Sequence, residues 1–276
     1  MKLPLLALFF IFTLSTAYSQ SFYRYEKDPR LSIILGTGLN NYYGELNDGH
    51  KFKLRSFNFS AGVQYPLTSR INLRGELMFY KISAADKDAP AESGRQSRNL
   101  SFRSNSMDLT FTGVINLLPE YLTWKDQRKL NPYFLAGFGF TYLNPEAEYE
   151  GNWYSLRALQ TEGISYKNVA PIFPVGLGIK YSLNRNIEFM AECVYRFTTT
   201  DYLDDVSTKY ISAEELIDPI AIALADRGPE IDVPRVEAGT KRGNPETNDG
   251  YLSLNFKMIF KLGEPKPLRR VPMNYY

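Results

Sequence analysis

Strict alternation of apolar and polar side chains in IEFMAECVYRF, residues 187–197, limits the fold of this chain more than any other feature. The odd positions are all apolar, whereas the even positions include Glu188, Glu192 and Arg196. A period of two is the period of a β-strand, whose successive side chains point to opposite faces. Such a strand separates an apolar space from a polar one, and alternation alone does not say which lies inside the molecule.

Seven further segments share this period. All eight are 11–14 residues long, whereas a globular strand averages about 5 or 6 residues and a tilted strand that crosses a bilayer needs about 9 to 11. The lengths therefore favour strands that span a membrane. The segments are residues 31–41, 54–65, 70–82, 106–118, 132–143, 170–183, 186–198 and 250–262.

The connections between these segments alternate in length. Only an up-and-down sheet places every other loop on the same rim, and outer-membrane barrels have short periplasmic turns and long external loops. The sequence thus predicts an all-β fold, an eight-stranded antiparallel up-and-down transmembrane β-barrel with long extracellular loops. The short connections are 66–70 and 183–186, the intermediate one is 119–131, and the long ones are 83–105, 144–169 and 199–249.

We predict that the apolar faces contact lipid and that the charged faces line the barrel. An eight-stranded interior is just wide enough for side chains to fill it, and an unpaired charge there would be costly, so acids and bases must pair. A soluble barrel such as a lipocalin would place the same faces the other way round, and it remains the alternative. The predicted lumen charge network is Arg74, Glu76, Asp108, Lys180, Glu188, Glu192, Arg196 and Lys257.

Glycines at alternate positions fall on the predicted inner face of three strands. A missing side chain leaves room for long charged side chains from other strands and lets the sheet bend. The glycines therefore support a lumen that is filled by side chains. The pairs are Gly36 with Gly38, Gly137 with Gly139, and Gly176 with Gly178.

Both ends of the sequence predict segments outside the barrel, which we place at residues 20–262. Residues 1–19 have a lysine, an apolar run and a small-x-small site, the pattern of a cleaved signal peptide, so we expect export to the cell outer membrane. Residues 263–276 are rich in proline and basic, which suits either a solvated tail or a peptide that docks on a periplasmic partner. The candidate docking residues are Lys266, Arg269 and Arg270.

Composition excludes several classes of protein. The net charge is +2 and no basic stripe is interleaved with aromatics, which excludes nucleic-acid binding. His50 is the only histidine and Cys193 the only cysteine, which excludes a multi-histidine metal site and an internal disulfide. We expect neither enzyme activity nor a cofactor or metal. The 20 tyrosines and 18 phenylalanines suit strands and membrane surfaces.

The long 199–249 segment contains a cluster of aspartates and two predicted helix starts. TDYLDDVS clusters Asp201, Asp204 and Asp205; such carboxylates suit Ca²⁺, but the spacing lacks the D-x-[DN]-x-[DN]-G pattern, so we favour capping of loop backbone. Further on, Ser212 and Glu215 form a capping box, and DPIAIALADRG predicts a second helix that ends by residue 228. We expect its apolar run, residues 220–225, to pack on the barrel mouth.

Three motifs carry a family resemblance. GTGLNNYYGEL, NPYFLAGFGFTYLNP and TDYLDDVST resemble the small outer-membrane barrels of Bacteroidota that include PorG, a component of the type IX secretion and gliding apparatus. The resemblance covers most of the mature chain and implies a non-catalytic barrel that ties a periplasmic ring to the outer membrane. Its motif residues here are Asn40, Asn41, Tyr42, Tyr43, Gly44, Asp201, Tyr202, Leu203, Asp204 and Asp205.

Three functions follow from these observations. The first is an anchor of a secretion assembly, with outer-membrane lipid or lipopolysaccharide and periplasmic ring proteins as partners. The second is a general surface, adhesion or envelope-stability protein that acts through its external loops. The third is a narrow pore, which a charged and filled eight-stranded lumen disfavours.

Overall fold

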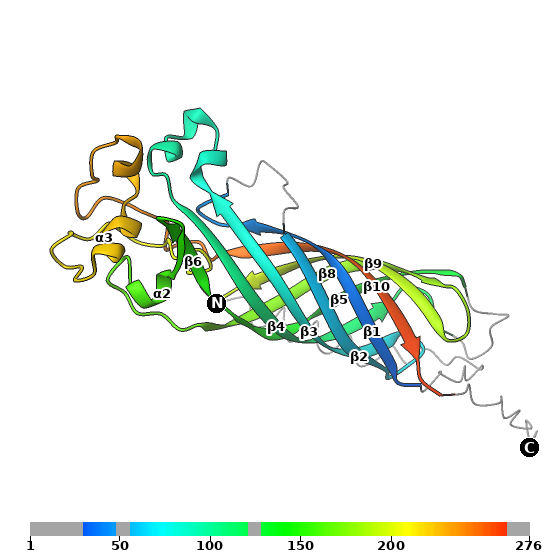
Figure 1. The fold of residues 1–276 in the computed structure, drawn as a ribbon. Coiled ribbons are helices and arrows are strands. Elements are labelled where there is room, and N and C mark those ends of the chain that lie inside the picture. Colours follow the sequence, from blue (N-terminus) through cyan, green and yellow to red (C-terminus); the bar gives the residue numbers. More distant parts are fainter. Residues whose placement is uncertain (1–29, 48–55, 121–127, 264–276) are drawn as a thin grey trace, which may run out of the picture.

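A computed structural model describes residues 30–47, 56–120 and 128–263. One antiparallel sheet, in the order β3-β2-β1-β10-β9-β8-β5-β4, closes on itself because β3 also pairs with β4 (Figure 1). The predicted eight-stranded up-and-down barrel is thus confirmed. Its strands are β1 (Ser32–Tyr43), β2 (Ser56–Pro66), β3 (Ile71–Ala85), β4 (Ser101–Asn116), β5 (Leu130–Tyr142), β8 (Val169–Ser182), β9 (Ile187–Thr198) and β10 (Gly250–Lys261).

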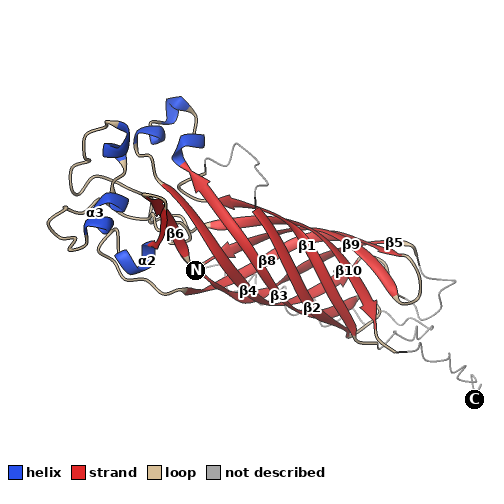
Figure 2. Ribbon diagram, in the orientation of Figure 1, coloured by secondary structure: helices blue, strands red, loops and turns tan. Residues whose placement is uncertain are grey.

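The two rims of the barrel differ, as Figure 2 shows. At one rim, which we call the short-turn rim, β2 passes to β3 and β8 to β9 through a few residues. Ser32 pairs with Lys261 at this rim, so the first and last strands begin and end there. The opposite end, which we call the long-loop end, carries every described helix and the additional strands.

The β3–β4 hairpin is longer than predicted. We expected these strands to end at residue 82 and begin at residue 106, but pairing continues to Ala85 opposite Ser101. Beyond the membrane, a strand no longer needs an apolar face toward lipid, so the alternation fades although backbone pairing continues. Phe102 in this extension is buried in a core formed by the loops.

The long loops carry structure of their own. The 144–169 connection, where we predicted no element, contains a hairpin that extends the sheet from β4, followed by one helical turn. Within the described ranges, no helix is long and apolar enough to cross a membrane. The loop elements are β6 (Pro145–Tyr149), β7 (Asn152–Ser155), α2 (Leu156–Leu159), α3 (Pro219–Ala225), and the 3₁₀ turns η1 (Asp86–Asp88), η2 (Ala91–Ser93), η3 (Arg95–Ser97) and η4 (Gly228–Ile231).

Of the two helix starts predicted in the 199–249 loop, one forms. Asp218 caps α3 by accepting the Ile220 N–H at 2.8 Å, but the capping box at Ser212 starts only a turn. Pro219 explains the difference, because the residue before a proline disfavours helical backbone and leaves too short a run after Ser212. Likewise, α3 ends at Ala225, and the residues from Gly228 form the separate turn η4.

A buried apolar cluster, which we call the cap core, fills the barrel mouth at the long-loop end. It joins strand residues to loop residues, including Leu224 of α3, as predicted for that apolar run. Large side chains thus cover the lumen from the outside. The cluster comprises Tyr42, Leu46, Met78, Tyr80, Ile82, Leu100, Phe102, Leu143, Ala147, Leu156, Ala170, Leu203, Val206, Leu224 and Tyr251.

Candidate functional site: a paired lumen and an acidic mouth

The middle of the lumen holds two cations and two anions from three strands. Arg74 donates to Glu192, and Lys257 Nζ lies 2.6 Å from both Glu76 carboxylate oxygens and 2.8 Å from Glu192 Oε2. The Tyr133 hydroxyl donates to Glu192 Oε1 at 2.6 Å. All four charged side chains are buried. Their charges cancel, so this cluster satisfies the requirement that buried charges be paired.

A second ion pair lies nearer the long-loop end. Arg196 Nε is 3.0 Å from Asp108 Oδ2, and Tyr251 donates its hydroxyl to the same carboxylate at 2.5 Å. Arg196 also donates to the Ser253 hydroxyl at 2.7 Å, while the ring of Tyr251 stacks on Tyr80 with centroids 4.8 Å apart. The polar network therefore passes directly into the cap core.

The third group lies near the short-turn rim and includes two residues that sequence reasoning missed. Lys180 Nζ lies 3.6 Å from Glu188, and Lys261 Nζ lies 2.8 Å from the same carboxylate. Lys180 also pairs with Glu120. Lys261 was detectable, because it lies four residues after Lys257 and so shares its inward face. Glu120 was not, because it follows β4 in a turn without periodicity.

The outer surface of the barrel has the opposite character. Phe57 is 76% exposed and Phe256 is 72% exposed, whereas Glu188 in the lumen is 1% exposed. Alternate residues of every strand therefore turn apolar side chains outward and polar side chains inward. Near the long-loop end, Tyr43 and Tyr195 lie side by side with centroids 5.8 Å apart, where aromatic residues commonly mark the membrane surface.

Glycines make the filled lumen sterically feasible. A Cβ on Gly36 would lie 2.5 Å from Lys257 Cγ, and one on Gly178 would lie 2.5 Å from Tyr133 Cζ. Real Cβ atoms do not approach other atoms so closely, so glycine at these positions leaves room for both side chains. Lys257 and Tyr133 are two of the groups that hold Glu192.

Two of the motifs meet at the barrel mouth. The Tyr42 hydroxyl lies 2.7 Å from Asp204 Oδ2 and 2.9 Å from Asp249 Oδ1, yet one phenol hydrogen serves only one carboxylate at a time. Asp204 also accepts the Val206 N–H at 2.9 Å, which is the capping role favoured from the sequence. Asp249 accepts the Leu203 N–H at 2.9 Å, so it ties the start of β10 to the loop after β9.

The rest of the 201–205 motif binds the neighbouring loop. Thr161 and Tyr166 donate their hydroxyls to Asp205, and the ring of Tyr202 stacks on Tyr166 with centroids 4.5 Å apart. Burial raises the pKa of Asp205 to about 6. Leu203 is fully buried in the cap core. This motif therefore holds the cap together.

The 40–44 motif has a similar structural role. Asn40 accepts a hydrogen bond from Asn58 at 2.8 Å, and Asn41 is also buried. A Cβ on Gly44 would lie 1.9 Å from both Asp249 Oδ1 and the Tyr42 hydroxyl oxygen. Gly44 thus lets the phenol and the carboxylate approach each other.

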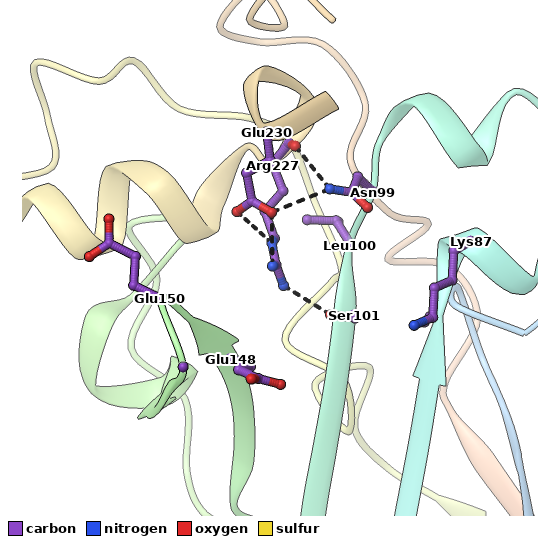
Figure 3. A pocket seen from close by; sticks show the side chains of 10 residues that line it. Lys87, Asn99, Leu100, Ser101, Glu148, Glu150, Arg227 and Glu230 are labelled. Carbon is purple, nitrogen blue, oxygen red and sulfur yellow. Dashed lines mark hydrogen bonds and ion pairs between the residues drawn. The ribbon is translucent and has the colours of Figure 1, made fainter. Parts of the chain in front are cut away.

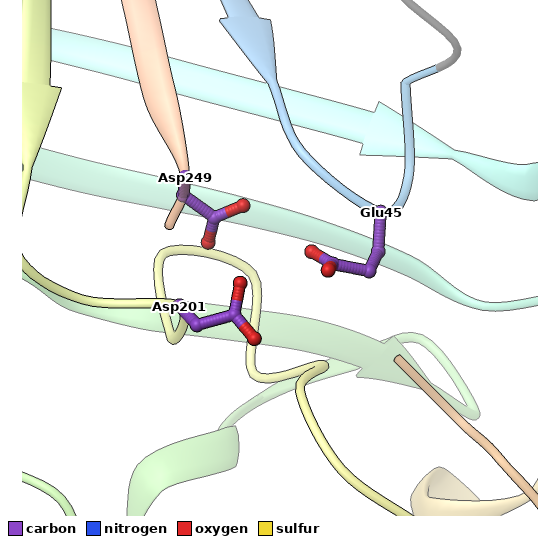
Figure 4. A group of neighbouring side chains, drawn as sticks. All are labelled: Glu45, Asp201 and Asp249. Atoms are coloured by element: carbon purple, nitrogen blue, oxygen red, sulfur yellow. The ribbon is translucent and has the colours of Figure 1, made fainter. Parts of the chain in front are cut away.

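Three carboxylates converge at this mouth from segments far apart in the sequence (Figure 4). One oxygen from each of Glu45, Asp201 and Asp249 lies within 4.8 Å of the others. Burial raises the pKa of Asp201 to about 7. Burial and the negative charges of Asp204 and Glu45 raise the pKa of Asp249 well above its usual value. We call this group the mouth triad; of its members, sequence reasoning had considered only Asp201.

A groove of about 310 Å³ lies among the loops at the long-loop end (Figure 3). Arg227 in its wall forms two hydrogen bonds with Glu230, each 2.9 Å long, and donates to the Ser101 hydroxyl at 2.9 Å. Asn99 donates weakly to Glu230 at 3.4 Å. Because these polar groups bind each other, they hold loops together rather than point at a ligand.

Several predicted residues lie outside the described ranges. These are the signal peptide, His50, and the candidate docking residues Lys266, Arg269 and Arg270. Their roles therefore stay predictions.

The closed sheet, the apolar exterior and the ionic interior together define a small membrane-spanning β-barrel of the outer-membrane type. The family model described as "Domain of unknown function (DUF6089)" matches residues 5–216. The chain belongs to this family. No curated protein matches the sequence.

Solved structures with a similar arrangement include three outer-membrane proteins. Neisserial surface protein A is 10% identical, with a TM-score of 0.44, over 84% of this chain and 97% of that one. The attachment invasion locus protein Ail of Yersinia pestis is 11% identical, with a TM-score of 0.40, over 85% and 100%. The N-terminal β-barrel domain of Pseudomonas aeruginosa OprF is 10% identical, with a TM-score of 0.37, over 85% and 100%.

Proposed function

We propose that this protein is a non-catalytic anchor in the outer membrane, which holds periplasmic ring proteins of a type IX secretion apparatus. The closed lumen is the observation that supports this proposal most directly. Its charges pair across the barrel, and the cap core covers its outer mouth. A protein of this kind acts through its two ends rather than by passing solute.

The two ends would have different tasks in this proposal. The family-like motifs at 40–44 and 201–205 both lie at the long-loop end, where they hold the cap together. They therefore support a rigid outer cap, facing lipopolysaccharide and the cell exterior. Periplasmic contacts fall to the short-turn rim and to the basic segment after Gly263, which lies outside the described residues.

Affinity purification from native outer membranes tests the proposal. We expect the tagged full-length chain to capture periplasmic ring components, and a chain with Lys266, Arg269 and Arg270 changed to glutamine to capture much less. Lys241→Gln, a charge change on an exposed cap residue, is the matched control and should leave capture unchanged. If the tail variant and the Lys241→Gln control captured equal amounts, the tail would not be the docking segment. If the unmodified chain captured no ring components, the anchor role would be rejected.

The folded cap supports a second candidate, a surface protein that binds through its outer loops. The cap has its own small core, formed by Leu216, Ala221 and Ala225, and next to it Ile217 is 99% exposed. Ile217 is the most exposed large apolar side chain of the described residues, so it is the cap position to change in a test. In whole-cell binding assays, Ile217→Ser should then reduce surface attachment while secretion continues. Loss of secretion with normal attachment would favour the anchor.

A further inference from the structure

The mouth triad has oxygen atoms without donors. Both oxygens of Asp201 and Oε2 of Glu45 are shielded from solvent and have no donor at normal hydrogen-bond geometry among the described residues. The Ser207 hydroxyl acts on Asp201 only from outside that geometry. Asp201 is only 7% exposed, and Figure 4 shows its carboxylate directed toward those of Glu45 and Asp249. A buried carboxylate without a partner has lost its solvation by water and gained nothing in return, so the arrangement calls for a positive partner.

Nearby side chains do not supply that partner. Arg98 is bound to Asp86 by two hydrogen bonds of 2.7 and 2.8 Å, and Arg242 forms an ion pair with Glu162 at 2.8 Å. Arg95 donates to the main-chain carbonyl of Glu45, not to its carboxylate. Across the part of the chain that the structure describes, no cationic side chain forms an ion pair with a carboxylate of the triad.

The existing hydrogen bonds orient the triad without neutralising it. Asp249 is held by the Tyr42 hydroxyl and by the Leu203 N–H, and Glu45 Oε1 accepts the Asn244 N–H at 3.2 Å. These donors point the remaining oxygens toward one another. In metal sites, the side chains that bind the ion are commonly oriented by hydrogen bonds from a second layer of residues. Tyr42, Leu203 and Asn244 occupy such positions here.

We propose that Glu45, Asp201 and Asp249 bind a calcium ion, which joins the loop after β1 to both ends of the 199–249 loop. Hard cations take carboxylate oxygens, and Ca²⁺ binds them at about 2.3 to 2.6 Å. Oxygens within 4.8 Å of one another can therefore all reach one central Ca²⁺. Mg²⁺ needs contacts of about 2.0 to 2.1 Å in a near-ideal octahedron and keeps several waters, whereas Ca²⁺ accepts irregular sets of protein oxygens. Three buried carboxylates from separate loop segments therefore suit calcium better.

This site differs from the calcium site that we considered, and did not favour, from the sequence. There, Asp201, Asp204 and Asp205 were neighbours in one loop, and their spacing did not fit a calcium motif. In the structure, Asp204 and Asp205 bind Tyr42, Thr161 and Tyr166. Only Asp201 of the three joins the site. The inference is independent of the proposed anchor role, because a cation that closes the cap serves any function of the barrel.

Calorimetric titration of the full mature chain tests the site directly. The chain is refolded in detergent without lipopolysaccharide, which itself carries divalent ions, and is freed of metal with a chelator. Calcium chloride alone is the probe. We expect one ion per chain with a dissociation constant of about 10⁻⁴ to 10⁻³ M, the range of extracellular calcium modules. No saturable binding up to about 10 mM, ten times the weak end of that range, or tighter binding of Mg²⁺ would overturn the proposal.

Asp201→Asn and Glu45→Gln provide two variants of nearly unchanged shape. Each should weaken calcium binding at least about tenfold, because the ion loses one charged ligand. Glu214→Gln, an exposed acid in the same loop, is the control and should bind as the unmodified chain does. Unchanged calcium affinity in both triad variants would overturn the assignment of these residues.

Hydrogen exchange of the 199–210 segment separates an ion-binding role from a merely structural one. In the unmodified chain, calcium should slow this exchange. In chelator, Asp201→Asn should exchange more slowly than the unmodified chain, since one repelling charge is gone, and calcium should have little further effect. Faster exchange of the variant in both conditions, or protection of the unmodified chain by acid but not by calcium, would overturn the proposal.

Discussion

The lumen and the mouth of this barrel both bury carboxylates, but they neutralise them differently. In the lumen, Glu76 and Glu192 share Lys257, and Glu192 also binds Arg74. At the mouth, Asp201 and Asp249 face Glu45, with no cationic side chain paired to them in the described residues. The first region is complete within the chain, whereas the second needs something from outside.

The difference follows from how each region is built. Lumen residues occupy strands whose neighbours and register are fixed by backbone pairing. Each acid is therefore held opposite a particular base on an adjacent or facing strand. Mouth residues come from three places where strands end, and only tertiary folding brings them together. Polar groups in a rigid barrel can therefore support stability alone, while those at strand ends are available to bind a ligand.

The largest effect is expected from removing an acid in the lumen. Glu192→Ala leaves Arg74 and Lys257 with one excess buried positive charge and should lower the free energy of unfolding by about 3 to 5 kcal/mol. Urea unfolding in detergent micelles, followed by circular dichroism, measures this. The double variant Glu192→Gln with Lys257→Met restores neutrality and should recover at least half of the loss. A loss of less than about 1 kcal/mol, the range of an exposed pair, would contradict a tightly paired lumen.

A methyl group at the mouth should have the next largest effect. Gly44→Ala places a Cβ 1.9 Å from Asp249 Oδ1 and from the Tyr42 hydroxyl, and overpacking of this kind costs about 1 to 3 kcal/mol. Calcium binding should weaken as well, because Asp249 must move. Gly113→Ala is the control, since its Cβ would lie 3.9 Å from the Ala136 carbonyl oxygen. Equal effects of the two substitutions in urea unfolding would show that the close approach at Gly44 does not matter.

Two tyrosine hydroxyls differ in their partners: that of Tyr42 binds carboxylates at the mouth, and that of Tyr80 binds a threonine hydroxyl. Tyr42→Phe deprives Asp204 and Asp249 of a donor and should cost about 1 to 2 kcal/mol, with a smaller loss in calcium than in chelator. Tyr80→Phe removes a hydroxyl that pairs with the neutral Thr141, so its cost should not depend on calcium. Parallel unfolding curves with and without the ion distinguish the two cases. Calcium dependence of the Tyr80 variant would argue against a localised site.

The smallest effect is expected from a partly exposed pair. Arg103 Nε lies 3.0 Å from Glu146 Oε2, where it attaches β6 to β4. Arg103→Met should cost less than about 1 kcal/mol, and the loss should shrink at high salt because exposed charges are screened. Unfolding at low and high salt measures this. A salt-independent loss as large as that of Glu192→Ala would abolish the contrast between buried and exposed charges.

Much of the fold could be predicted because the alternation of side chains along a barrel strand shows which face contacts lipid and which faces the lumen. Each lipid-facing residue is followed by a lumen-facing one, so Phe189 and Glu192 reveal their faces through spacing alone. The alternating lengths of the connections then predicted the up-and-down order of the strands, and which rim carries the short turns and which the long loops. The same rule placed all eight predicted charges inside, where the structure finds them buried.

Prediction failed where the alternation stops. The β6–β7 hairpin and the upper β3–β4 hairpin stand above the membrane, so their side chains follow the needs of the cap core rather than those of lipid. The capping box at Ser212 is a correct local signal, but Pro219 limits the helix that it would start. Glu120 joins the lumen network from a turn, where no period marks its direction.

The sequence by itself determined the strands, their inward and outward faces, and the charge balance of the lumen, because these depend on residues one or two positions apart. Only the tertiary structure decided which charges meet. Closure of the ring brings β4 beside β3 and sets Glu192 between Arg74 and Lys257. The loops then bring Glu45, Asp201 and Asp249 together across more than two hundred residues, because electrostatic contacts depend on distance in space and leave no period in the chain.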